Sequence, residues 1–263
     1  MSTPEDPVRV EPVLDGACWR VVLDAPKGNV LDSAMIRALT RVAEQADACL
    51  HHECRPLRAL LFTGEGRHFS FGASVEEHRP AEVGDMLPAF HALFRTLLDS
   101  RLFLLAAVRG QCLGGGLELA AFCHRLYASP DARLGQPEIR LGVFAPIGSL
   151  VLPPRVGRAR AAELCLTGRV LAAEEALAWG LVDEVAEDPE AAALRFVEER
   201  LVPLSAAALR FAVAGLDAGY AVRFREDLAR AEKLYLEGLM ATHDAAEGIE
   251  SFLAKREPAW RHA

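Results

Sequence analysis

Three consecutive glycines and two glutamates are the residues of this sequence best suited to chemistry. The glycines occupy positions 114–116, Glu118 follows two residues later, and Glu138 lies after Pro137 in a loop that can face Glu118. Glycine inside a helix costs about 1 kcal/mol relative to alanine, whereas at a helix N-terminus bare N–H groups can approach a ligand closely. Backbone donors beside two carboxylates can stabilise an enolate while protons are transferred. The pattern therefore indicates an enzyme.

A second glycine turn, at Gly72, supplies another candidate donor. It closes a loop after a predicted strand, so the N–H of Ala73 can point into a pocket instead of a β-ladder. The N–H of Gly115 would complete the pair, and two donors aimed at one carbonyl oxygen form an oxyanion hole, worth about 3–4 kcal/mol per donor. Each turn alone is more often an ordinary connection between a strand and a helix. The interpretation depends on their combination with the two glutamates.

Glu118 has an unusual neighbourhood for a glutamate in a helix. Leu117, Leu119 and Ala120 adjoin it, and burial among such residues would raise its pKa towards neutrality. That range suits a group that must both accept and donate a proton. Glu138 is informative only as its partner, because a Pro-Glu pair in a loop is normally on the surface. No His or Cys spacing typical of a metal site occurs, so we expect no metal.

The composition is that of a globular protein with a sizeable core. The chain has 263 residues, of which 51% are hydrophobic and 25% charged, and its formal net charge is −8. This charge, without a basic run, argues against nucleic acid and anionic membranes as partners. The sequence has neither a long uncharged apolar stretch nor the pattern of a secretory signal at its start, so we expect a cytoplasmic protein. Six cysteines without a Cys-x-x-Cys pair fit reduced thiols.

The predicted elements place these residues in an α/β fold. Strand patterns at 19–23, 58–63, 103–108 and 125–128 alternate with helix patterns at 32–50, 86–99 and, after the triple glycine, 117–123. This alternation favours a mostly parallel sheet covered by helices. From about residue 157 the spacing of apolar residues predicts helices only, at 158–166, 172–179, 189–201, 204–216, 224–240 and 242–255. We therefore expect an α/β core over residues 1–189 and a helical C-terminal segment over 190–263.

The order and spacing of these motifs resemble the crotonase (enoyl-CoA hydratase/isomerase) superfamily over essentially the whole chain. The similar segments are 23–31, 69–73, 108–119 and 180–185, and the two glutamates occupy the positions of the catalytic pair of the hydratases. The resemblance implies a crotonase-like core of repeated ββα units with a C-terminal trimerisation segment. It also implies an acyl-CoA thioester substrate, bound by the N–H groups of Ala73 and Gly115, and no cofactor, since CoA is part of the substrate.

Further substrate contacts follow from the same resemblance. Lys27 would meet a CoA phosphate, with a solvated surface lysine as the alternative, and the carbonyl of Phe71 would accept from the adenine amine. Gly72 and Gly114 belong to the two oxyanion loops. The resemblance further implies a trimer or a dimer of trimers, in which Phe252 and Lys255 would lie near the nucleotide bound to a neighbouring subunit.

A narrower resemblance concerns the acyl group. Segments 69–78, 109–113, 142–146, 211–213 and 239–245 are similar to cyclohexa-1,5-diene-1-carbonyl-CoA hydratases, which act in anaerobic degradation of aromatic acids through benzoyl-CoA. Ser74 stands where many hydratases have aspartate, and Pro146 begins a segment that replaces their glycine-rich turn. With Phe144, these residues should shape the pocket for a flat, cyclic acyl group.

The resemblance implies hydration of this diene to 6-hydroxycyclohex-1-ene-1-carbonyl-CoA. Glu118 would orient the water, and Glu138 would deliver a proton to the far end of a dienolate.

The alternative functions are a general short-chain enoyl-CoA hydratase and a 3-hydroxyacyl-CoA dehydratase, and, remotely, a non-catalytic scaffold or RNA-binding member. An enoyl-CoA isomerase needs only one carboxylate, so the presence of two glutamates favours addition or removal of water. For His68, His78 and His243 we expect surface or structural roles.

Overall fold

Two β-sheets form the centre of the molecule in the computed structural model, which describes residues 6–52 and 56–263, with side chains for all of these except 49–52. The larger sheet has six strands in the order β1-β2-β3-β4-β6-β9. Only β1 is antiparallel to its neighbour. Its strands are β1 (Val8–Val13), β2 (Cys18–Leu23), β3 (Ala59–Gly64), β4 (Phe103–Val108), β6 (Arg125–Ala128) and β9 (Glu184–Val185).

The second sheet is smaller and has three short strands. It contains β5 (Gln111–Leu113), β7 (Arg133–Gly135) and β8 (Val170–Ala172), with β5 parallel to β7 and β7 antiparallel to β8. The strands β5 and β7 lead directly into the glycine run and into the segment that carries Glu138. This small sheet therefore fixes the relative position of the two candidate catalytic segments.

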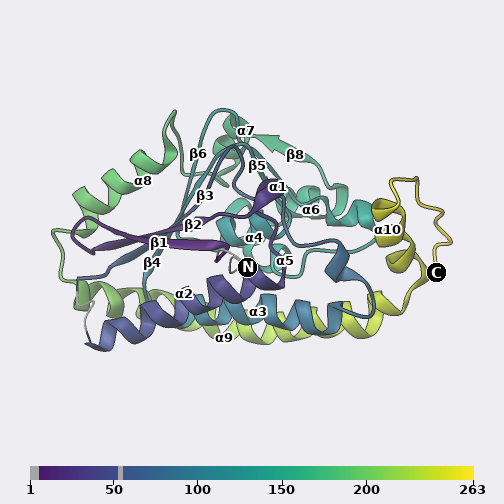
Figure 1. Cartoon of the computed structure of the whole chain (residues 1–263), viewed down its shortest axis with the longest axis horizontal. Helices are drawn as coiled ribbons and strands as arrows, with labels where there is room; N and C mark the ends of the chain where they lie inside the picture. Colours follow the sequence, from purple (N-terminus) through teal and green to yellow (C-terminus); the bar gives the residue numbers. More distant parts are fainter. Residues whose placement is uncertain (1–5, 53–55) are drawn as a thin grey trace, which may run out of the picture.

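Helices cover both faces of the larger sheet, which explains why its central strands are apolar throughout. On one face, the core joins the sheet to α2 (Ser33–His52), α3 (Val83–Asp99), α4 (Gly115–Phe122) and α9 (Ala206–Lys233). On the other face, a second cluster joins Leu61, Leu105 and Tyr127 to α8 (Pro189–Phe196). Figure 1 shows α2, α3 and α9 running side by side along one side of the sheet, with α8 on the opposite side.

The remaining helices are shorter. They are α1 (Pro26–Asn29), α5 (Gly148–Val156), α6 (Arg158–Thr167), α7 (Ala173–Trp179) and α10 (His243–Leu253). Single 3₁₀ turns occur at η1 (Glu76–His78), η2 (Pro137–Leu141) and η5 (Leu239–Ala241), and π-helical turns at η3 (Val197–Leu201) and η4 (Leu234–Gly238).

The predicted α/β class with a mostly parallel sheet and a helical C-terminal part is confirmed, but several elements differ, and the short strands β5 and β7 were not predicted. The edge strand β1 was not expected, and it contains Pro12, which a central strand would not tolerate. Residues beyond 157 include β8 and β9, so that region is not helical only. The helices predicted at 204–216 and 224–240 are one continuous helix, α9, extended by η4. The helix α5 was missed because it contains Pro153 and Pro154, which disfavour a helix interior.

The last helix, α10, packs on the same chain. A Cβ added at Gly248 of α10 would lie 2.1 Å from the carbonyl oxygen of Leu141, so η2 and α10 are in direct contact. Figure 1 places α10 at the end of the molecule where the chain terminates. The C-terminal segment therefore supports the turn that carries Glu138.

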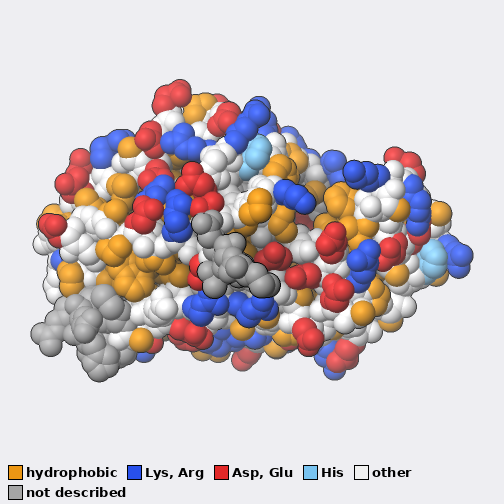
Figure 2. Space-filling view, viewed as in Figure 1, with side chains coloured by type: hydrophobic (Ala, Val, Ile, Leu, Met, Phe, Trp, Pro, Cys, Tyr) orange, Lys and Arg blue, Asp and Glu red, His pale blue; other side chains and the backbone are white. Residues whose placement is uncertain are grey.

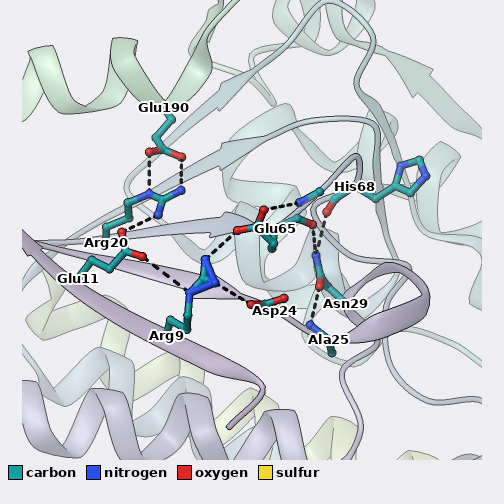
Figure 3. Close-up of polar contacts among 10 residues, drawn as sticks. Arg9, Glu11, Arg20, Asp24, Ala25, Asn29, Glu65, His68 and Glu190 are labelled. Carbon is teal, nitrogen blue, oxygen red and sulfur yellow. Dashed lines mark hydrogen bonds and ion pairs between the residues drawn. The ribbon is translucent and has the colours of Figure 1, made fainter. Parts of the chain in front are cut away.

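Surface charges of both signs are interspersed over the described part of the face shown in Figure 2. Many are paired, and Figure 3 shows Arg20 between Glu11 and Glu190, which connects β2 to the start of α8. Arg9 pairs with Asp24 at 2.7 Å in the same region. Since these side chains are partly exposed, each pair contributes about 1 kcal/mol or less.

Within the described residues, no single helix has the length and apolar composition needed to cross a membrane. One pair of helices, Pro189–Leu201 and Ala206–Ala241, meets both conditions only when taken together, and it is bent by 106°.

Candidate active site

The three glycines form the entry to α4. The glycines lie at a helix N-terminus, as predicted, although the helix already begins at Gly115; Gly114 precedes it with φ 51° and ψ −128°, a conformation that favours glycine. The N–H of Gly114 donates to the carbonyl of Gly135 at the end of β7 (2.9 Å). The N-terminus of α4 is thereby fixed against the small sheet, with its first free N–H groups directed away from the ladder.

The two predicted oxyanion loops lie against each other. Gly72 has φ 98°, and a Cβ at this position would lie 2.7 Å from the carbonyl oxygen of Leu113. A Cβ at Gly115 would lie 3.1 Å from the backbone nitrogen of Ala73. In the described part of the chain, no hydrogen-bond acceptor is recorded for the N–H of Ala73 or of Gly115. Two free donors therefore adjoin each other at a helix N-terminus, an arrangement that can stabilise an oxyanion.

Asn29 and Ser70 hold the first of these loops in place. Asn29 is buried, accepts from the N–H of Ala25 (2.9 Å) and donates to the carbonyl of His68 (2.9 Å), as Figure 3 shows. The hydroxyl of Ser70 donates to the carbonyl of Asn29 (2.7 Å) and accepts from the N–H of Gly72 (3.0 Å). The segment around α1 and the loop after β3 are thus one hydrogen-bonded unit.

Glu118 lies in the first turns of α4 and is 3% exposed. Its Oε1 accepts from the N–H of Gly148 at 2.6 Å, at the N-terminus of α5. Burial raises the pKa of this carboxyl, and the backbone donors of Gly148 and Ile147 oppose part of the rise. The group is therefore oriented by α5 and close to the pKa range needed for proton transfer at neutral pH.

Glu138 lies in η2 and faces the same site. A Cβ at Gly114 would be 2.6 Å from its Oε1, so only glycine leaves room for this carboxyl. Its Oε2 is buried, and no partner for it occurs among the residues described. Burial is the main cause that raises the pKa of Glu138, and the neighbouring charge of Glu118 adds to it. Because like charges at close range disfavour double ionisation, the pair holds a proton near neutral pH.

The residues predicted to shape the acyl pocket lie on separate segments of the chain. The ring of Phe144 lies 5.3 Å from that of Tyr235, and Pro146 is buried just before α5. The hydroxyl of Ser74 accepts from the N–H of Glu77 (3.4 Å) at the start of η1. These residues come from three separate parts of the chain, and their contact with an acyl group stays a prediction.

Comparisons with known proteins agree with this geometry. The sequence profile of the enoyl-CoA hydratase/isomerase family matches residues 15–263. The chain belongs to the enoyl-CoA hydratase/isomerase family. It is 49% identical to a cyclohexa-1,5-dienecarbonyl-CoA hydratase of Thauera aromatica, over 100% of both chains, and 34% identical to a probable enoyl-CoA hydratase of Rhizobium meliloti, over 94% of this chain and 95% of the relative. A crystal structure of an enoyl-CoA hydratase/isomerase from Pseudoalteromonas atlantica is similar with a TM-score of 0.82 and 25% identity, covering 97% of this chain and 99% of that one.

Both predicted resemblances are therefore confirmed, the wider one to the enoyl-CoA hydratase/isomerase family and the narrower one to the ring-diene hydratases. The crotonase-like fold is confirmed by the solved enoyl-CoA hydratase structures. The free donors and both glutamates lie inside the segment that matches this family.

The residues predicted to contact CoA lie near the surface. Lys27 is exposed with φ 65°, and the ring of Phe71, a residue that is 45% exposed, packs directly over Gly28. Phe252 is 54% exposed in α10, and Lys255 is exposed just after it. Their contacts with CoA stay predictions.

Three residues of the site were missed from the sequence. Gly148 positions Glu118, as described above. Gln136 is buried, and with its amide oriented to donate it bonds the carbonyl of Gly114 (3.0 Å). Tyr235 is buried beside Phe144. Of these three, only Gln136 could have been found from the sequence, because it stands next to Pro137 and Glu138. Gly148 and Tyr235 have no such signal, since a glycine at a helix start and a tyrosine within a helix are usually structural.

His78 and His68 bond backbone groups, and His243 bonds a neighbouring side chain. His78 bonds the carbonyl of Ser74 through Nδ1 (2.7 Å), and burial lowers its pKa, so the ring is neutral. His68 accepts from the N–H of Gln111 (3.1 Å), and His243 pairs with its neighbour Asp244. In the described ranges, no group of three or more His, Cys, Asp or Glu is placed to hold a metal ion.

Proposed function

We propose that this family member is an acyl-CoA hydratase, a hydro-lyase that adds water to a conjugated enoyl- or dienoyl-CoA thioester. The observation that carries the proposal is the pair of buried carboxyls, Glu118 and Glu138, next to the free N–H groups of Ala73 and Gly115. An isomerase would need one carboxyl to move one proton. With two carboxyls, one can take a proton from the attacking water while the other donates a proton to carbon.

In the proposed mechanism, the N–H groups of Ala73 and Gly115 hold the thioester carbonyl and stabilise the negative charge that develops on its oxygen. Glu118, fixed by the N-terminus of α5, orients the water that attacks the β-carbon and takes its proton. A new C–O bond forms and the electrons move to the thioester as an enolate. Glu138, which is protonated at rest, delivers a proton to carbon and completes the addition. No cofactor takes part, since CoA belongs to the substrate.

The proposed substrate is cyclohexa-1,5-diene-1-carbonyl-CoA. The support is the 49% identity to the Thauera aromatica hydratase over the full length of both chains, together with the aromatic wall of Phe144 and Tyr235. Attack at the β-carbon of this diene gives a dienolate, and protonation at its far end yields 6-hydroxycyclohex-1-ene-1-carbonyl-CoA. A place in anaerobic benzoyl-CoA degradation in the cytoplasm follows from this substrate and belongs to the proposal.

The contacts outside the reacting centre complete the proposal. Lys27 binds a CoA phosphate, the carbonyl of Phe71 accepts from the adenine, and Ser74 and Pro146 shape the acyl pocket. The chain assembles as a trimer or dimer of trimers through its C-terminal segment, 190–263, and Phe252 and Lys255 approach the nucleotide of a neighbouring subunit. The core with the acyl-CoA site comprises residues 1–189.

A side-by-side assay of the ring diene and crotonyl-CoA tests the substrate. We expect kcat/KM to favour the ring diene by at least about tenfold, or roughly 1.4 kcal/mol of transition-state preference. Equal or better turnover of crotonyl-CoA would assign a general short-chain hydratase or a dehydratase instead. Absence of activity with both thioesters would contradict the proposal of a hydratase.

A further inference from the structure

Tyr235 carries a buried polar group that the mechanism above does not use. The residue is 0% exposed, and its hydroxyl has no hydrogen-bond partner among the described residues. Leaving a buried hydroxyl without a partner costs about 1–3 kcal/mol, so such a group calls for an explanation.

The surroundings of this hydroxyl connect it to the two carboxyls. Glu138 and Glu118 are the charges that act on Tyr235, with Glu138 the stronger. Its ring packs 5.3 Å from Phe144, which lies on the segment between Glu138 and Gly148, the partner of Glu118. The Oε2 of Glu138 is also buried without a partner. Two unsatisfied polar groups therefore border the same site.

The backbone at Tyr235 is also unusual. The helix α9 ends at Lys233 and continues as the π-helical turn η4, in which Tyr235 is the second residue. A π-turn shifts the direction of the side chains that follow relative to a regular helix, and such turns occur frequently at functional sites. The neighbouring His78 does not serve as a partner, because its Nδ1 is bonded to Ser74 and its ring lies edge-on to Tyr235 at 6.4 Å.

We propose that the hydroxyl of Tyr235 binds the reacting water, and the hydroxyl group that this water becomes in the product, together with the carboxyl of Glu138. A buried water is held by about three polar partners, and the unsatisfied groups of Tyr235 and Glu138 with Glu118 supply that number. Burial is the main cause that raises the pKa of Tyr235, so the phenol keeps its proton and orients the water without exchanging protons with it. The inference rests on the proposed hydratase function.

The test compares Tyr235→Phe with wild type and with Tyr127→Phe. Tyr127 is a matched control, because its hydroxyl is equally buried and without a partner among the described side chains, but it belongs to the cluster on the α8 side of the sheet. We expect Tyr235→Phe to lower kcat for hydration by about 10- to 100-fold with little change in KM, and Tyr127→Phe to leave both unchanged.

Two further readouts separate water binding from packing and from proton transfer. The inhibition constant of the product, 6-hydroxycyclohex-1-ene-1-carbonyl-CoA, should rise by about tenfold in Tyr235→Phe, whereas binding of cyclohexane-1-carbonyl-CoA, which lacks the hydroxyl, should not change. Both limbs of the pH–rate profile should keep their positions.

Three results would overturn the inference while leaving the hydratase proposal intact. They are a Tyr235→Phe rate within about twofold of wild type, equal weakening of both ligands, and loss of one limb of the pH–rate profile. Lack of hydration by the wild-type enzyme with either thioester would instead overturn the proposed function and the inference with it.

Discussion

At the scale of single residues, two adjacent carboxyl groups are buried together, which is costly unless a proton is shared between them. Glu118 has a backbone donor from α5, whereas the Oε2 of Glu138 has no partner in the described part of the chain. This asymmetry favours ionisation of Glu118 and protonation of Glu138. The pair then offers an acceptor and a donor at the same pH, which addition of water requires.

Replacing either carboxyl by an amide should abolish proton transfer while keeping the shape of the site. We expect Glu118→Gln and Glu138→Gln each to lower kcat by about two orders of magnitude or more. Steady-state rates with the preferred thioester provide the measurement, and Glu174→Gln, at an exposed position in α7, is the control. If both variants stay within a few-fold of wild type, the assignment of these carboxyls is wrong.

The same substitutions should stabilise the protein in a pH-dependent way. The ordinary carboxyl pKa of 4.5 is raised to about 7 for Glu118 and about 8 for Glu138, because burial disfavours the charged forms. From pH 4.5 up to about 7 for Glu118, and up to about 8 for Glu138, the unfolded chain has lost the proton and the folded chain retains it, so wild-type stability falls as pH rises through these windows. The gain of Glu138→Gln over wild type should therefore be near zero at pH 4.5 and grow as pH rises towards 8, with a slope of at most about 1.4 kcal/mol per pH unit.

Urea unfolding at several pH values measures this difference. Glu247→Gln gives a control of opposite sign, because Arg256 lowers the pKa of Glu247 to about 2 and its contribution is present above its unfolded pKa of 4.5 and lost as pH falls. A stability difference for Glu138→Gln that does not change with pH would contradict the raised pKa.

At the scale of elements, two glycine turns from different ββα segments approach each other more closely than side chains would permit. In Gly115→Ala the new Cβ would lie 3.1 Å from the nitrogen of Ala73 and 3.2 Å from the ring of Phe90, so the first oxyanion loop must shift by a few tenths of an ångström. Because both donors must aim at one oxygen, we expect kcat to fall by about 10- to 100-fold in a folded protein.

Gly84→Ala is the matched control for this substitution. Gly84 lies in the first turn of α3, and a Cβ there has no atom within 4 Å. We expect unchanged turnover and a free energy of unfolding that is equal or higher by less than about 1 kcal/mol. Unchanged turnover in Gly115→Ala as well would mean that the N–H of Gly115 does not contribute to an oxyanion hole.

The elements near the glycines could be predicted from the sequence, because the local pattern there points to one structural role. A glycine run before an apolar helix indicates a helix entry, and a glutamate among leucines indicates burial, and both are found. Contacts between segments that are distant in the sequence could not be predicted, because no local sequence pattern indicates them. The bond from Gly148 to Glu118 depends on α5, whose two prolines argue against a helix, and Tyr235 has the spacing of an ordinary core residue.

At the scale of the whole molecule, the C-terminal segment has two kinds of surface. On one side α9 and α10 cover the core of their own chain, through buried residues such as Phe224, Leu228 and Ile249. Elsewhere on the surface of the molecule, α9 exposes large apolar side chains: Phe211 is 75% exposed, Leu216 74% and Val222 60%. Single exposed apolar residues are normal on a surface, and we expect these three to lie in the proposed interface between subunits.

We therefore expect a trimer or hexamer in sedimentation velocity at micromolar concentration. Burial of each of these side chains contributes about 1.5–3 kcal/mol, so a charge at two of them should outweigh the remaining contacts of a marginal interface. Phe211→Glu combined with Val222→Glu should shift the population towards monomer, without lowering the urea midpoint of the α/β core by a comparable amount. If the wild-type protein sediments as a monomer at this concentration, α9 is not an assembly surface and the active site belongs to a single chain.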